Sequence, residues 1–154
     1  MLVYRLYKSA YITEPLSAEG ARRAGGRWNP KGYPILYTSA TPELALLEIV
    51  AHLNPLYLPS FQLLVLDIPD AHHLVRLADL PPNWQDEQQN EVLQAYLWDW
   101  LNQPDTLCVS VPSAIVDRSR NYLLHTLHPR FKDAVKIVEN VPFPVDGRLL
   151  KTNG

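Results

Sequence analysis

Residues 25–53 have the sequence GGRWNPKGYPILYTSATPELALLEIVAHL, which combines a loop, a strand and a helix in direct succession. Its Gly, Asn and Pro residues predict a loop at the start, and ILYTS (35–39) predicts a strand. Thr41 is placed to cap a helix that has Pro42 at its first position and ends near Leu53. The sequence therefore predicts a loop, a strand and a capped helix in direct succession.

Short elements are predicted on both sides of this stretch, separated by many of the 14 prolines of the chain. Apolar and β-branched runs predict strands, and apolar residues at helical spacing predict a helix in EVLQAYLWDWL. The expected strands are residues 2–7, 61–68, 106–111 and 134–140, and the expected helical segments are 17–24 and 91–101. The tail offers a turn at Asp146-Gly147 and space for a final short strand. Because helices and strands do not alternate regularly, we expect one α+β domain over residues 1–154 rather than a doubly wound parallel sheet.

The composition argues against several classes of protein. With 14 Lys and Arg against 16 Asp and Glu, the net charge is −2, whereas nucleic-acid binders usually carry a basic excess. No apolar run approaches the ~18 residues of a membrane helix, and the start lacks the features of a signal peptide. The single Cys108 leaves no disulfide framework or Cys-rich zinc site, and the histidines lack metal-ligand spacing. We therefore expect a soluble cytoplasmic domain without a metal, and no direct contact with nucleic acid or membrane.

Glu48 is the one charge in the apolar segment LALLEIVA, and Leu44 and Ala51 lie on the same helical face. Burying an unpaired carboxylate is costly unless it is paired, hydrogen-bonded or neutralised. Glu48 therefore lies either at the wet edge of the helix, in a salt bridge, or in a polar site.

The glycine-rich loop and one serine are further candidates. Gly26 lets the backbone approach a ligand, Arg27 offers a planar fork for phosphate or carboxylate, and Trp28 offers a flat surface. The alternative is an ordinary surface loop with a packed tryptophan, and the spacings of known phosphate-binding loops are absent. Ser113 follows a predicted strand and Pro112, where it forms either part of a site or a turn hydrogen bond. The absence of GxSxG gives no support to a serine hydrolase.

The loop GGRWN, the strand YTS, the helix segment ALLE and the turn VPS occur in this order, together with LPPNW (80–84) and VPSAIVDRSRNYLLHTLHPRF (112–131). In this combination the chain resembles the RES-domain toxin family, which is named for an arginine, a glutamate and a serine. The matching positions are Arg27, Glu48 and Ser113, and Tyr37 matches a tyrosine of the family's active site. One departure is that NYLL continues into His125-Thr126, where family members commonly have Asn-Pro.

The resemblance implies a single domain with a split mixed β-sheet and flanking helices, similar to the ADP-ribosyltransferase toxins. It implies a toxin that cleaves the nicotinamide–ribose bond of NAD, with NAD as substrate and no prosthetic group. The implied catalytic residues are Arg27, Tyr37, Glu48 and Ser113, and the implied substrate-binding residues are Gly26, Trp28, Asn29 and Asn121. Tyr37 is expected to pack against or orient the nicotinamide ring.

The resemblance also implies a partner, an antitoxin with an Xre-like helix-turn-helix domain, in a hetero-oligomer. The acceptor of the ADP-ribose group stays open among water, phosphate and a protein side chain. The alternatives are a protein ADP-ribosyltransferase toxin and a non-catalytic interaction module.

Overall fold

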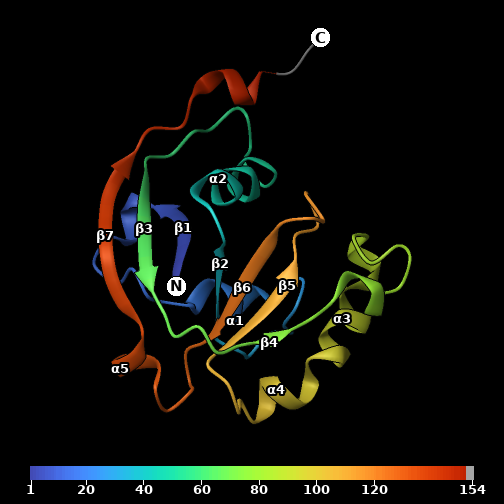
Figure 1. Ribbon diagram of the computed structural model, residues 1–154. Coiled ribbons are helices and arrows are strands. Elements are labelled where there is room, and N and C mark those ends of the chain that lie inside the picture. The colour runs from blue at the N-terminus through green and yellow to red at the C-terminus, as the bar shows by residue number, and fades with distance from the viewer. Residues whose placement is uncertain (152–154) are drawn as a thin grey trace.

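The computed structural model describes residues 1–151, which form a seven-stranded mixed sheet with flanking helices (Figure 1). The strand order is β4-β5-β6-β2-β1-β3-β7. Neighbouring strands are antiparallel except for the parallel pair β4 and β5. The strands are β1 (Leu2–Lys8), β2 (Ile35–Ser39), β3 (Phe61–Asp67), β4 (His73–Leu74), β5 (Cys108–Pro112), β6 (Arg120–His125) and β7 (Lys136–Phe143). The expected α+β class with a mixed sheet is confirmed.

The sheet is split between β1 and β2. These two strands share a single register pair, Tyr4 with Ser39, whereas β1 pairs with β3 along its whole length and β2 pairs with β6 along its whole length. Helix α2 (Pro42–Val50) lies in the opening between the two halves (Figure 1). Because the sheet is split, α2 occupies a position between strands that would be adjacent in a continuous sheet.

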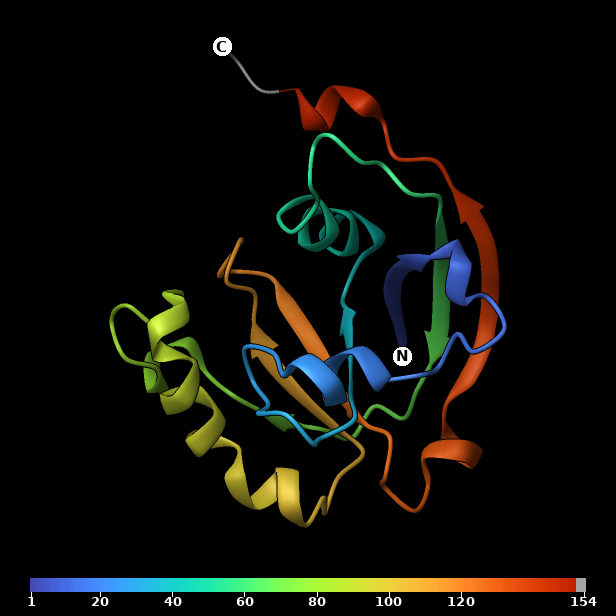
Figure 2. The same ribbon diagram turned by 180° about the vertical axis from the view of Figure 1, so that it is seen from behind.

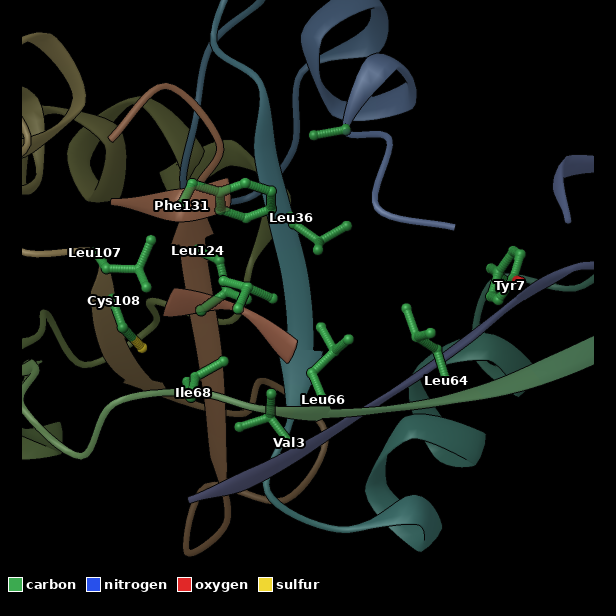
Figure 3. Close-up of a cluster of buried hydrophobic side chains, with 12 residues drawn as sticks. Val3, Tyr7, Leu36, Leu64, Leu66, Ile68, Leu107, Cys108, Leu124 and Phe131 are labelled. Carbon is green, nitrogen blue, oxygen red and sulfur yellow. The ribbon is translucent and has the colours of Figure 1, made fainter. Parts of the chain in front are cut away.

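Apolar packing joins the two halves of the sheet on one face. Val3 of β1 and Leu66 of β3 are buried in the same cluster as Leu36 of β2 and Leu124 of β6. Figure 3 shows these side chains turned toward one another across the split. Burial of this apolar surface compensates for the ladder hydrogen bonds that β1 and β2 do not form.

Of the remaining helices, the first three flank the half of the sheet that contains β2, and the last lies beside the start of β7 (Figure 1). They are α1 (Glu19–Ala24), α3 (Asn90–Tyr96), α4 (Trp98–Asn102) and α5 (Phe131–Ala134), with 3-10 turns at Ser9–Tyr11, Leu77–Asp79, Glu87–Gln89 and Gly147–Leu150. Helix α1 lies against β2, as Figure 2 shows from the opposite side. Helices α3 and α4 bury Leu93 and Trp100 against Val109 of β5 and Leu123 of β6. None of the helices within residues 1–151 has the length and apolarity needed to cross a membrane.

Three local predictions differ from the structure. Strand β6 was not predicted, and it is specified by its pairing with β2 on one side and β5 on the other. The single helix predicted at 91–101 breaks at Leu97, and the apolar spacing continues across the break because both helices contribute to one cluster. Residues Gly147–Leu150 form a 3-10 turn instead of a strand, since the Asp146 carboxylate accepts a hydrogen bond from the Arg148 amide.

Candidate active site

A cleft of about 1010 Å³ opens where the sheet splits. Its walls come from α1, α2, α3, the glycine-rich loop, the middle of β1 and the ends of β2 and β6. This volume is at the upper end of the range of small-molecule sites, about 300–1,000 Å³. All of the predicted site residues line the cleft except Ser113, which lies directly beneath its surface.

Glu48 is the centre of a hydrogen-bonded cluster at one end of the cleft. Its Oε1 atom accepts hydrogen bonds from the Ser113 hydroxyl at 2.9 Å and from the Asn121 amide nitrogen at 2.8 Å. The Asn121 amide oxygen accepts a hydrogen bond from the Ser39 hydroxyl at 2.8 Å. Ser39 and Asn121 are register partners in β2 and β6, so sheet pairing brings this cluster together.

The carboxylate of Glu48 is half-buried and is held by neutral donors. Within residues 1–151, no Lys, Arg or His nitrogen forms a salt bridge with it, and only Oε1 has hydrogen-bond partners. The structure therefore places Glu48 in a polar hydrogen-bonded cluster and not in a salt bridge. Its second oxygen is available to a ligand.

Ser113 is fully buried, and its hydroxyl takes part both in a turn and in the Glu48 cluster. Its hydroxyl oxygen accepts hydrogen bonds from the amides of Ile115 and Val116 at 3.1 and 3.2 Å, which is the pattern of a serine turn. The same hydroxyl donates its hydrogen to Glu48. Ser113 thus orients the carboxylate from below.

Arg27 lies in the cleft wall, and one nitrogen of its guanidinium is hydrogen-bonded to backbone carbonyl oxygens. Its Nη1 atom donates to the carbonyl oxygens of Gln85 at 2.9 Å and Trp84 at 3.2 Å, and its Cζ atom is 6.0 Å from the centre of the Trp84 ring. The edge formed by Nε and Nη2 has no partner among residues 1–151. This edge offers three N–H donors in the geometry that binds phosphate or carboxylate in a bidentate manner.

Tyr37, Trp28 and Asn29 form the base of the glycine-rich loop. The Tyr37 hydroxyl donates to Oδ1 of Asn29 at 2.5 Å and accepts from the Trp28 amide at 3.2 Å, and burial raises the pKa of Tyr37. Asn29 is 0% exposed and Trp28 is 3% exposed. The expectation that these two side chains bind substrate directly does not agree with their burial. Trp28 instead packs on Trp84, with ring centres 6.2 Å apart.

Arg5 is a candidate residue that the sequence reasoning missed. It lines the cleft from β1. Its Nη1 atom donates to the carbonyl oxygen of Tyr37 at 2.9 Å, at the split where β1 and β2 share a single register pair. Within residues 1–151 it has no carboxylate partner, and burial lowers its pKa. A lone charge in the apolar strand LVYRLY was the available signal, of the same kind that singled out Glu48.

Metal-ligand geometry is not found in the part of the chain that the structure describes. In residues 1–151, no three or more His, Cys, Asp or Glu side chains are grouped so as to hold a metal ion. The charged groups of the cleft include Arg5, Arg27 and Lys31 as well as the carboxylates of Glu48, Glu87 and Glu91. Its guanidinium and ammonium groups suit an organic anion.

Fold and site together define an α+β protein with a candidate active site in the split of its sheet. The chain belongs to the RES family, since the family model of the RES domain matches residues 2–146. It is 30% identical over 151 residues to Toxin Res of Yersinia enterocolitica serotype O:8 / biotype 1B, covering 97% of this chain and 99% of that protein. It is 35% identical over 127 residues to the Prs ADP-ribosylating toxin of Sphingobium sp. (strain YBL2), covering 79% of each protein.

The fold is also similar to that of a solved structure. A chain in the crystal structure of the M. tuberculosis MbcT-MbcA toxin-antitoxin complex superposes with a TM-score of 0.71 and 19% sequence identity. The match covers 97% of this chain and 86% of that chain. At this level of identity the similarity concerns the fold.

Proposed function

We propose that this chain is the toxin of a toxin–antitoxin pair and that it consumes NAD by breaking the nicotinamide–ribose bond. The observation that carries the proposal is the Glu48 carboxylate, which neutral donors hold with one oxygen free. In the same cleft, Arg5 and Arg27 have no carboxylate partner among residues 1–151. The free oxygen of Glu48 complements the cationic nicotinamide riboside, and the two guanidinium groups complement the anionic pyrophosphate of a dinucleotide.

The chemistry assigned to Glu48 is electrostatic. Nicotinamide leaves as a neutral base with the electrons of the broken bond, so positive charge develops on the ribose. The free oxygen of Glu48 stabilises this charge and binds a ribose hydroxyl, and Ser113 and Asn121 hold the carboxylate in its orientation. Arg27 and Arg5 bind the pyrophosphate, away from the bond that breaks.

The acceptor distinguishes two versions of this function. Capture of the ribose cation by water or phosphate gives free ADP-ribose or its phosphate, whereas capture by a side chain modifies a protein. The similarity to a protein named Prs ADP-ribosylating toxin favours keeping the second version as an alternative. Both versions require the same bond to break first, so the role of Glu48 is common to them.

The test uses NAD that carries a label in its adenosine half. The purified chain is incubated with this NAD alone, with phosphate, and with a bacterial extract, and the products are separated. We expect nicotinamide in every arm, together with label in free ADP-ribose, in its phosphate or on a protein. Intact NAD in all three arms, from folded protein, refutes the proposal. The chain is then a non-catalytic interaction module, in which Arg27→Ala disturbs complex formation alone.

The proposal includes an antitoxin with an Xre-like helix-turn-helix domain, a hetero-oligomeric complex and a cytoplasmic location. The solved neighbour is part of a toxin-antitoxin complex, which supports a partner of this kind. With a net charge of −2, this chain lacks the basic surface that DNA binding needs, so DNA contact is assigned to the antitoxin. Copurification with the protein encoded by the neighbouring gene, followed by light scattering, tests the partner and the stoichiometry.

A further inference from the structure

We propose that Asn29 and the hydroxyl group of Tyr37 are positioning residues that hold the backbone of Arg27 in place for the pyrophosphate. The inference rests on the proposed function and assigns Tyr37 a role different from contact with the nicotinamide ring. It follows from the hydrogen bonds beneath the glycine-rich loop.

Asn29 connects three parts of the fold from a fully buried position. Its amide nitrogen donates to the carbonyl oxygens of Ala21 at 3.1 Å, Pro30 at 2.9 Å and Tyr33 at 3.1 Å. Its amide oxygen accepts the hydrogen of the Tyr37 hydroxyl. The side chain thus ties α1 and the loop to β2, and its amide hydrogens are engaged within the protein, so none is left for a substrate.

The Tyr37 hydroxyl is also committed to the loop. Its only hydrogen is donated to Asn29, and its oxygen accepts the Trp28 amide at 3.2 Å. A Cβ atom on Gly26 would lie 2.7 Å from this oxygen, so glycine is required there for space. The hydroxyl therefore has no hydrogen to offer to a ligand while the loop keeps this structure.

These contacts anchor the peptide groups on both sides of Arg27. On one side, the carbonyl oxygen of Gly26 accepts a hydrogen bond from the Gln94 side chain of α3 at 2.9 Å. On the other side, the amide of Trp28 donates to Tyr37 of β2. Arg27 is held between a helix and a strand, so the direction of its guanidinium depends on both anchors.

This role predicts a specific kinetic signature. The pyrophosphate is remote from the bond that breaks, so its contact with Arg27 has similar strength in the ground state and in the transition state. Loss of such a contact raises KM and leaves kcat nearly unchanged. A purely structural defect lowers the amount of active enzyme, which decreases the apparent kcat and leaves KM unchanged.

The variant that carries the test is Tyr37→Phe, which keeps the ring and removes the hydroxyl. Asn29→Ala removes four hydrogen bonds from a fully buried position and leaves the Pro30 carbonyl oxygen and the hydrogen of the Tyr37 hydroxyl without their partners, so we expect it to fold poorly. The matched control is Tyr33→Phe, because the Tyr33 hydroxyl donates to Asn102 and does not touch the loop backbone.

For Tyr37→Phe we expect KM for NAD to rise about tenfold while kcat stays within about twofold of wild type. We expect the Trp28 amide, which loses its acceptor, to exchange its hydrogen about tenfold faster. In an Arg27→Lys background, Tyr37→Phe should raise KM by less than about twofold, because the two residues act through one contact. Tyr33→Phe should change none of these values.

Three results overturn the inference while the proposed function stands: an unchanged KM in Tyr37→Phe, a loss of kcat at constant KM, or additive effects with Arg27→Lys. An unchanged exchange rate of the Trp28 amide also overturns it, and this measurement needs no substrate. Absence of NAD turnover by the wild-type protein overturns the proposed function, and the inference falls with it.

Discussion

Replacement of Glu48 by glutamine removes one negative charge from the cleft and keeps the shape of the side chain. The glutamine oxygen can still accept the hydrogen bonds from Ser113 and Asn121, which measure 2.9 and 2.8 Å in the native protein. Each bond becomes neutral and weaker by about 1 kcal/mol, and relief of the desolvation of a half-buried charge offsets this loss. We expect the free energy of unfolding to change by about 1 kcal/mol or less.

The expected effect on the proposed reaction is much larger. A positive charge that develops about 4 Å from the carboxylate is stabilised by about 4 kcal/mol at an effective dielectric constant of about 20. This corresponds to about a 10³-fold difference in rate. Because the nicotinamide ring is cationic before the bond breaks, part of the interaction is already present in the ground state. We therefore expect kcat to fall by about 10²–10³-fold.

The assay is nicotinamide release, measured with wild type, Glu48→Gln and the control Glu43→Gln, and each preparation is also unfolded in urea. Glu43 is an exposed residue in the first turn of the same helix, so its variant removes a charge outside the cleft. We expect the control to retain wild-type kcat. Wild-type turnover by Glu48→Gln refutes the electrostatic role of the carboxylate. A loss of turnover matched by a large loss of stability shows that Glu48 supports the fold instead.

Three further predictions concern stability and reactivity. Gly26→Ala places a Cβ atom 2.7 Å from the Tyr37 hydroxyl and should cost about 1–3 kcal/mol in urea unfolding. Gly147→Ala, with no neighbouring atom within 4 Å, should be nearly neutral. Burial lowers the pKa of His125, so the unfolded chain binds a proton more readily than the native chain. The free energy of unfolding should therefore be constant above about pH 7 and should fall as the pH drops below about 6.5, a dependence that His125→Gln removes. Burial raises the pKa of the Cys108 thiol to about 12, so a thiol reagent should label it in urea and not in the native protein.

Much of the local structure was predictable because its causes are local. The ILYTS strand formed as expected, and the helix after Thr41 begins as expected but ends at Val50 instead of near Leu53. The Thr41 hydroxyl accepts the Leu44 amide at 3.1 Å, as a helix cap should. Strand β6 was not predictable in this way, because its segment Arg120–His125 mixes polar and apolar residues. Its conformation depends on ladder hydrogen bonds to β2 and β5, which lie far away in the sequence.

The candidate site shows the same division. By itself, the sequence determined that Glu48 is an anomalous charge and that Arg27 lies on a glycine-rich loop, since both follow from neighbouring residues. Only the tertiary structure decided that Ser113 and Asn121, 65 and 73 residues away from Glu48, hold its carboxylate. Tertiary structure also decided that Asn29 is buried in the wall of the cleft. The physical reason is that a hydrogen bond requires two groups to meet, and strand register and burial determine which groups meet.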